Sequence, residues 1–171
     1  MQPVENSYSL PLKKEGLTLY RGWNDDVAHQ LVERSQEPEI KKFTHRDAAE
    51  RFVSEQAAND WYHAKDHIVY ALFQGDDLAG VAWFARTERP ELGADYTFAI
   101  RMYESQRGRG LAGALIESAH ADLAAYKNYA GAFWLESDES NERAVHFYQK
   151  HAYELLGVKD GRVLMVRRGA S

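Results

Sequence analysis

The stretch Gln106-Arg107-Gly108-Arg109-Gly110-Leu111-Ala112-Gly113 decides the fold of this chain, because it is a glycine-rich turn that runs straight into a helix. An apolar residue recurs every four positions after the turn and predicts a helix of roughly four turns, with the stripe Leu111, Leu115, Ala119 and Leu123. Residues 96–100, just before it, are aromatic and β-branched and predict a strand. Bare glycines ahead of the unpaired N–H groups of a helix favour an anion, so the turn predicts a phosphate-binding site.

Spacing separates the phosphate-binding patterns that these glycines could form. A P-loop needs Lys and then Ser or Thr after its second glycine, but Leu111-Ala112 follows Gly110, which excludes a nucleotide triphosphatase of that kind. Residues 108–113 do satisfy the dinucleotide pattern Gly-x-Gly-x-x-Gly. That pattern, however, expects an early βαβ unit and an acidic ribose ligand about twenty residues later, whereas Tyr126-Lys127-Asn128-Tyr129 stands here.

A third pattern, Arg/Gln-x-x-Gly-x-Gly/Ala, is met by Arg107, Gly110 and Ala112. Residues 135–154 supply a second motif, a strand followed by Asn-x-x-Ala-x-x-Phe/Leu-Tyr-x-x-x-Gly-Phe. Four of its positions match in register, namely Asn141, Ala144, Phe147 and Tyr148, while Ala152-Tyr153 replaces Gly-Phe. With both motifs in this order, residues 68–156 resemble the GCN5-related N-acetyltransferases (GNAT), and the first half resembles them only in the order of its elements.

The resemblance implies an α/β fold with a mixed, mostly antiparallel central sheet of six to seven strands and helices on both faces. In the family, the strand before the glycine turn and the strand ending at Glu136 run parallel and splay apart, and coenzyme A enters the gap. Acetyl-coenzyme A is therefore the expected acyl donor, and no metal is expected. The residues expected to hold it are Phe98, Ala99, Ile100, Arg107, Gly108, Arg109, Gly110, Leu111, Ala112, Gly113 and Asn141. The backbone of residues 109–112 is expected to matter more than the exposed arginine side chains.

Acyl transfer from a thioester to an amine needs a neutral nucleophile and a proton for the leaving thiolate. A phenol, with a reference pKa near ~10, can supply that proton without being ionised at rest, and the resemblance places Tyr148 near the sulfur. Glu136 lies twelve residues before Tyr148. Family members resembling the ribosomal-protein N-terminal acetyltransferases have a glutamate at this spacing that acts as the base. A solvated carboxylate is the alternative interpretation of Glu136, with Asp95 and Tyr96 as substitute bases.

The function expected from these residues is acetyl-coenzyme A-dependent N-acetylation of a primary amine, in a small molecule or at a peptide N-terminus. The alternative is a non-catalytic acyl-coenzyme A-binding or sensing module. Thiol release from acetyl-coenzyme A in the presence of amines distinguishes the two, because a sensor binds without releasing thiol. The sequence names neither the acceptor nor the acyl length, and it is compatible with a homodimer without fixing the oligomeric state.

Composition predicts one domain over residues 1–171, with residues 1–16 as a polar lead-in, because 171 residues that are 44% hydrophobic can bury one core. The net charge of −5 argues against a nucleic-acid partner and suits a cationic one. The longest apolar runs are far too short to span a bilayer, and no signal peptide is visible, so a soluble cytoplasmic protein is expected. Cysteine is absent, which removes disulfides and thiolate metal sites.

The first half of the chain predicts a strand at 17–21 and a short helix capped by Asn24. A second helix is expected from near Asp47, with the stripe Ala49, Phe52, Val53, Ala57 and Trp61. In the family's plan these two helices line the acceptor groove. His63 and His67 stand at i and i+4, but no third ligand is indicated, so a solvent-facing pair at a helix end is a better interpretation than a metal site.

Further along, residues 68–74 and 78–86 predict two strands joined by a hairpin turn, followed by a loop over 87–94. A strand at 132–136 precedes a helix from about 141 to 151. Residues 153–158 and 162–166 flank Asp160-Gly161, a strong signal for a two-residue hairpin.

Overall fold

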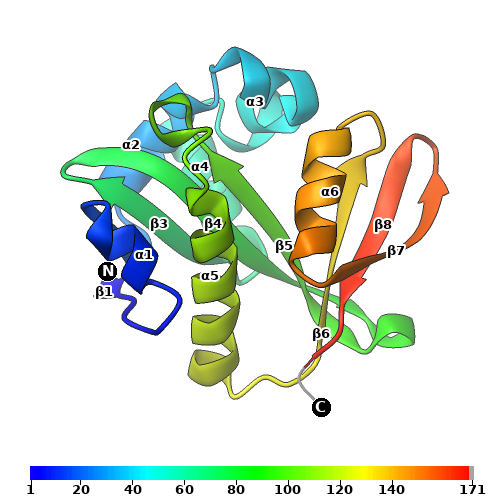
Figure 1. Ribbon diagram of the computed structural model, residues 1–171. Coiled ribbons are helices and arrows are strands. Elements are labelled where there is room, and N and C mark those ends of the chain that lie inside the picture. The colour runs from blue at the N-terminus through cyan, green and yellow to red at the C-terminus, as the bar shows by residue number, and fades with distance from the viewer. Residues whose placement is uncertain (170–171) are drawn as a thin grey trace.

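The computed structural model describes residues 1–169 and arranges them around one eight-stranded sheet with helices on both faces (Figure 1). The spatial order of the strands is β1-β2-β3-β4-β5-β6-β8-β7, and only β5 and β6 pair in parallel. The strands are β1 (Gln2–Pro3), β2 (Leu17–Arg21), β3 (Ile68–Gln74), β4 (Asp77–Arg89), β5 (Ala94–Met102), β6 (Ala132–Asp138), β7 (Tyr153–Lys159) and β8 (Arg162–Arg167). The α/β class and the mostly antiparallel sheet were predicted, and the strand count exceeds the expected six to seven.

The helices are distributed along the whole described chain. They are α1 (Leu10–Lys14), α2 (Asp25–Arg34), α3 (Pro38–Phe43), α4 (Glu55–Ala64), α5 (Leu111–Lys127) and α6 (Glu142–Lys150), with single turns η1 (Asp47–Arg51), η2 (Pro90–Leu92) and η3 (Glu104–Gln106). None of the described helices is both long and apolar enough to cross a membrane.

Two hydrophobic clusters lie on the two faces of the sheet and hold the helices in place. On one face α5 and α6 pack through residues such as Leu115, Ile116 and Tyr148, and these two helices stand in front of the sheet in Figure 1. On the other face α2 and α4 pack through Leu31 and Ala58 among others. The central strands are buried over residues 68–73 of β3 and 78–85 of β4, because helices cover them on both sides.

Local sequence signals explain most of these elements. The Asn24 side chain accepts a hydrogen bond from the backbone N–H of Val27 at 2.9 Å, which caps α2 as predicted. Asp160 and Gly161 both have positive φ, at 52° and 75°, the geometry of a two-residue hairpin turn that joins β7 to β8. The strand, glycine turn and long helix that were expected around residues 106–113 are β5 and α5.

Three expectations for the chain were wrong in detail. The lead-in over 1–16 is not merely polar, because it forms β1 and α1 and buries Val4 and Leu12 in the core. No single helix starts near Asp47: a π-type turn, η1, ends at Arg51, and α4 begins separately after Ser54, whose hydroxyl caps it. The loop expected over 87–94 is shorter, because β4 continues to Arg89.

The parallel strands β5 and β6 diverge in the middle of the sheet. Their register pairs Ala94 with Ala132, Tyr96 with Phe133 and Thr97 with Trp134, and no pair follows. Beyond that point β6 is held by β8, and β5 by β4. The edge of β5 from Phe98 onward therefore faces a gap, as the family resemblance implied.

Candidate active site

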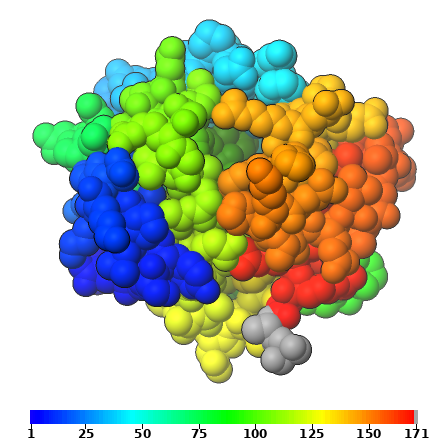
Figure 2. All heavy atoms as spheres, in the orientation of Figure 1, coloured from blue at the N-terminus to red at the C-terminus, as the bar shows by residue number. Residues whose placement is uncertain are grey.

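A cavity of about 850 Å³ opens where β5 and β6 diverge. Its walls come from both faces of the sheet, because Phe147 and Tyr148 of α6 line it together with Thr44 and Trp83 from the opposite side. Figure 2 shows the molecule hollowed between the start of α5 and α6, beneath the segment around α3. A ligand in this opening could reach through the sheet from one face to the other.

The glycine turn presents an uncapped helix N-terminus at the edge of this cavity. Gly108 and Gly110 have φ of +81° and +73°, in the left-handed region that favours glycine, and open space lies where a Cβ would project from either. No side chain caps the first turn of α5, so its N–H groups and dipole are available to an anion. Leu111 is buried in the core, Ala112 lines the cavity, and Gly113 lies against the ring of His151.

The two arginines of the turn are engaged with the protein. The Arg107 guanidinium binds Glu37 at 2.8 Å and the carbonyl of Met102 at 3.2 Å. Arg109 binds Glu15 at 2.6 Å and also contacts Gln106. Backbone groups of the turn are therefore better placed than these side chains to meet a phosphate.

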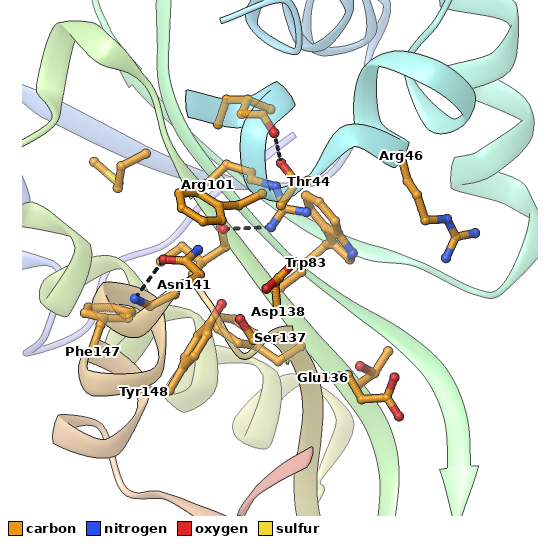
Figure 3. Close-up of a pocket in the computed structure, with 18 of the residues that line it drawn as sticks. Thr44, Arg46, Trp83, Arg101, Glu136, Ser137, Asp138, Asn141, Phe147 and Tyr148 are labelled. Atoms are coloured by element: carbon orange, nitrogen blue, oxygen red, sulfur yellow. Dashed lines mark hydrogen bonds between the residues drawn. The ribbon is translucent and has the colours of Figure 1, made fainter. Parts of the chain in front are cut away.

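The strand and helix residues expected at the donor site lie around the same opening. Phe98, Ala99 and Ile100 line the cavity along the free edge of β5. Asn141 lines it too, but its side-chain oxygen accepts the N–H of Ala144 at 3.2 Å and caps α6. The amide NH₂ of Asn141 remains free to donate to a ligand, and Figure 3 shows the capping bond beside the cavity.

Tyr148 lies on α6 with its ring directed into the cavity (Figure 3). The residue is only 7% exposed, and within residues 1–169 its hydroxyl makes no hydrogen bond to the protein and stays open to the cavity. Burial raises the pKa of this phenol, and the nearby positive charge of Arg101 partly offsets the rise. At neutral pH the group is therefore a protonated donor without a protein acceptor.

Glu136 reaches the cavity from β6, on the other side of the gap. Because neighbouring residues of a strand face opposite sides, Leu135 packs into the core while Glu136 points to the face that carries Trp134. Its carboxylate is 40% exposed and lies 3.4 Å from Arg89. In Figure 3 the side chain stands apart from Tyr148, at the outer end of the cavity. The substitute bases fit less well, because neither Asp95 nor Tyr96 lines the cavity and Tyr96 is buried against Tyr129.

A buried charge cluster at the cavity was not foreseen from the sequence. Asp47, 1% exposed, binds Arg101 through Nε at 2.8 Å and Arg51 through Nη1 at 3.1 Å. Both guanidinium groups lie over the ring of Trp83, at 4.8 Å for Arg101 and 6.0 Å for Arg51. The one signal in the sequence is the position of Arg101. It lies two residues after Ala99 in β5, and alternate residues of a strand face the same side, so Arg101 shares the cavity-facing side of Ala99.

The early helices contribute less to the cavity than expected. No lining residue comes from α2 or α4; the wall is built by the end of α3, η1 and the turn between them, including Phe43, Thr44 and Arg51. His63 is exposed at the end of α4, whereas His67 is buried, so the expected solvent-facing pair is wrong for His67. Within residues 1–169 no three acidic or histidine side chains gather as metal ligands.

Comparison with known proteins agrees with this geometry. An acetyltransferase of the GNAT family from Streptococcus pneumoniae matches with a TM-score of 0.71 at 18% identity, covering 90% of this chain and 99% of that one. The spermidine N-acetyltransferase from Vibrio cholerae, solved with coenzyme A and spermine, matches with a TM-score of 0.71 at 17% identity, covering 91% and 96%. The aminoglycoside acetyltransferase AAC(6')-Ib, solved with coenzyme A, gives 0.70 at 18% identity, covering 89% and 94%.

These structural matches are too distant in sequence to show more than the fold. A comparison of the sequence with curated proteins gives no significant match. The acetyltransferase (GNAT) family itself matches residues 28–153, which span the early helices, the glycine turn and the Tyr148 helix. The chain belongs to the GNAT family of acetyltransferases.

Proposed function

We propose that this protein transfers an acetyl group from acetyl-coenzyme A directly to a primary amine, in a small molecule or at a peptide N-terminus. The observation that carries the proposal is Tyr148, a largely buried residue that lines the cavity between the diverging strands and whose hydroxyl has no protein partner within residues 1–169. A hydroxyl that faces a ligand-sized opening and makes no bond to the protein is free to donate its proton to a bound group.

The residues around the opening fit the donor. The uncapped start of α5 and the left-handed glycines 108 and 110 suit a pyrophosphate, and the unpaired edge of β5 from Phe98 to Ile100 suits an extended arm that carries amide groups. Asn141 can add its NH₂ group. Once bound, the donor supplies an activated acetyl group and a thiolate leaving group. Fold relatives solved with coenzyme A support this assignment.

Two side chains have proposed chemical roles. Tyr148 donates its proton to the leaving sulfur, since burial keeps the phenol protonated at neutral pH. Glu136 accepts a proton from the incoming ammonium, directly or through a bridging water, and Arg89 holds the carboxylate from the side. The carbon–nitrogen bond forms as the carbon–sulfur bond breaks, so the products are an amide and a free thiol.

The experiment is a thiol-release assay with acetyl-coenzyme A and a panel of primary amines, with mass spectrometry of the amine product. The expected result is amine-dependent thiol release together with an acetylated amine. Thermal stabilisation by acetyl-coenzyme A without thiol release from any amine would instead identify a non-catalytic acyl-coenzyme A sensor.

A further inference from the structure

The cavity has the opposite charge to the protein as a whole. The chain carries a net charge of −5, yet seven arginine and lysine side chains and only three carboxylates line the cavity. The cations are Arg46, Arg51, Lys65, Arg101, Arg107, Arg143 and Arg162, and the carboxylates are Glu39, Glu136 and Asp138. A positive cavity in an acidic protein attracts anions locally.

The buried cluster at the acceptor side holds one uncompensated positive charge. Asp47 is a single carboxylate shared by two guanidinium groups. Arg101, 10% exposed, uses Nε and Nη2 on Asp47 and Nη1 on the carbonyl of Ile100, so each of its three guanidinium nitrogens has an acceptor. Arg51 uses only Nη1, on Asp47, and is 27% exposed. Within residues 1–169 the Nε and Nη2 groups of Arg51 have no acceptor, although the side chain lines the cavity.

Free cations outnumber free carboxylates around Arg51. Lys65 lines the same cavity and makes no ion pair within the described part of the chain. Two of the three lining carboxylates have neighbours, since one oxygen of Glu136 lies 3.4 Å from Arg89 and Asp138 accepts hydrogen bonds from the N–H and hydroxyl of Ser140. Glu39 lies exposed on α3, at the outer wall. Recognition of a polyamine requires carboxylates with free lone pairs, and this cavity offers few.

We infer that the amine acceptor also carries an oxyanion, a carboxylate or a phosphate, and that Arg51 binds it. The inference rests on the proposed N-acetyltransferase function. A guanidinium with two free donors matches such an oxyanion in a bidentate fork, and the Trp83 ring and Asp47 hold that fork in place. Burial and the charge of Arg101 lower the pKa of Arg51, and a bound anion would offset both effects by stabilising the charged guanidinium.

The experiment compares matched pairs of amines in the thiol-release assay. β-Alanine is paired with β-alaninamide and phosphoethanolamine with ethanolamine, and spermidine serves as the polycation. The expected result is a kcat/KM at least about tenfold higher for one anionic member than for its neutral partner, because a charge-assisted pair contributes that much or more. A preference within the β-alanine pair would identify the oxyanion as a carboxylate, and a preference within the phosphoethanolamine pair would identify it as a phosphate. Preference for spermidine or for the neutral members would overturn the inference.

Variants of Arg51 test the assignment to this residue. Arg51→Gln should raise KM for the anionic amine about 10- to 100-fold and leave KM for acetyl-coenzyme A unchanged, while Arg51→Lys recovers part of the loss. Asp47 keeps its ion pair with Arg101 in both variants, so the buried carboxylate is not left without a partner and both variants should fold. Arg86→Gln, which removes an exposed arginine paired with Glu88 outside this cavity, is the matched control. An unchanged preference in Arg51→Gln would contradict the inference.

A binding measurement separates this inference from the proposed function. Anionic amines should raise the melting temperature of the parent protein more than their neutral partners, and Arg51→Gln should remove the difference. If no amine releases thiol but this difference is present, the proposed function fails and the anion site stands. If no anionic amine stabilises the parent protein, the anion site is overturned whether or not amines are acetylated.

Discussion

At the scale of single residues, the proposed mechanism assigns the two proton transfers to Tyr148 and Glu136, which lie on opposite sides of the gap. Tyr148 comes from α6 and is buried, whereas Glu136 comes from β6 and is 40% exposed. A buried phenol holds its proton until the thiolate develops, and an accessible carboxylate can exchange protons with solvent after each turnover. Each position therefore suits a different half of the reaction.

Tyr148→Phe removes only the hydroxyl and keeps the ring. We expect kcat to fall by about 10²–10⁴, with the affinity for acetyl-coenzyme A nearly unchanged, because the proposed role of the lost group is to protonate the leaving sulfur. Tyr153→Phe is the matched control: its hydroxyl hydrogen-bonds His120 in the core at 2.9 Å, so that change should cost about 1 kcal/mol of stability and leave kcat in place. Turnover of Tyr148→Phe within a few-fold of the parent would make Tyr148 a packing residue.

Glu136→Gln should slow turnover most near neutral pH and less as the pH rises, because free amine becomes abundant without a base. Neutralising a lysine-type amine at pH 7 costs about 4.6 kcal/mol and an α-amino group about 1.4 kcal/mol. The pH profile of kcat/KM should therefore recover near pH ~8 for an α-amino acceptor and near pH ~10 for a lysine-type one. Glu154→Gln, on the exposed face of β7, is the control. A uniform loss at every pH would mean that Glu136 only positions the substrate.

At the scale of elements, the proposed donor site depends on the start of α5, which no side chain caps. Gly110→Glu should abolish thermal stabilisation by acetyl-coenzyme A, since the carboxylate would oppose the diphosphate at the start of α5. Backbone strain at φ +73° could also lower coenzyme binding by destabilising the turn. Gly161→Glu controls for this strain, because Gly161 has φ +75° and equally open surroundings but lies in the β7–β8 turn, away from the start of α5. Retained stabilisation in Gly110→Glu would remove this turn from the donor site.

Elements with strong local signals could be predicted from the sequence, and those set by distant contacts could not. The β5–α5 unit, the Asn24 cap and the Asp160-Gly161 turn are encoded by residues next to one another, so their patterns sufficed. Ala49, Phe52 and Val53 follow a helical spacing across the break between η1 and α4, so the sequence pattern predicts one continuous helix there, although Val53 is 55% exposed in the structure. Ser54 is the local signal for the break, because a serine at this position can cap the start of a new helix, as it does for α4.

The candidate site shows the same division. Tyr148, Glu136 and the glycine turn belong to motifs that are continuous in sequence. The cluster of Asp47, Arg51 and Arg101 joins η1 to β5 across more than fifty residues, and only the packing of both against Trp83 brings it together. Such a cluster has no period and no motif, so pattern analysis could not find it.

At the scale of the whole molecule, two neutral histidines lie buried on opposite faces of the sheet. His120 accepts the Tyr153 hydroxyl and donates to the carbonyl of Ile116, while His67 stacks on Trp61. Burial lowers the pKa of both, that of His67 to about 4. Below pH ~6.5 these histidines bind protons in the unfolded chain, where their pKa is near ~6.5, but stay neutral in the folded protein until a lower pH. The two histidines therefore cost no stability above pH ~6.5, and they lower the free energy of unfolding progressively as the pH falls below that value.

Urea unfolding at a series of pH values measures this effect. Between pH ~6.5 and ~4, His67 alone should remove roughly 2–3 kcal/mol of the free energy of unfolding. His67→Gln should make the decline shallower by up to about 1.4 kcal/mol per pH unit, and His63→Gln, at an exposed position, should leave it unchanged. Equal slopes in all three proteins would show that His67 takes up its proton without unfolding.

The position of β8 between β6 and β7 bears on how the protein is made. On the ribosome β6 emerges before β8, and at ~5–20 residues per second the partner strand follows roughly 1–5 s later. During that interval one edge of β6 is unpaired and α6 has no finished sheet to cover, so Tyr148 and the cavity form only after the rest is in place. Pulsed proteolysis of stalled chains should find residues 1–127 protected while β6 is still cleaved. Nascent chains that lack β8 are then the form of this protein most in need of a chaperone.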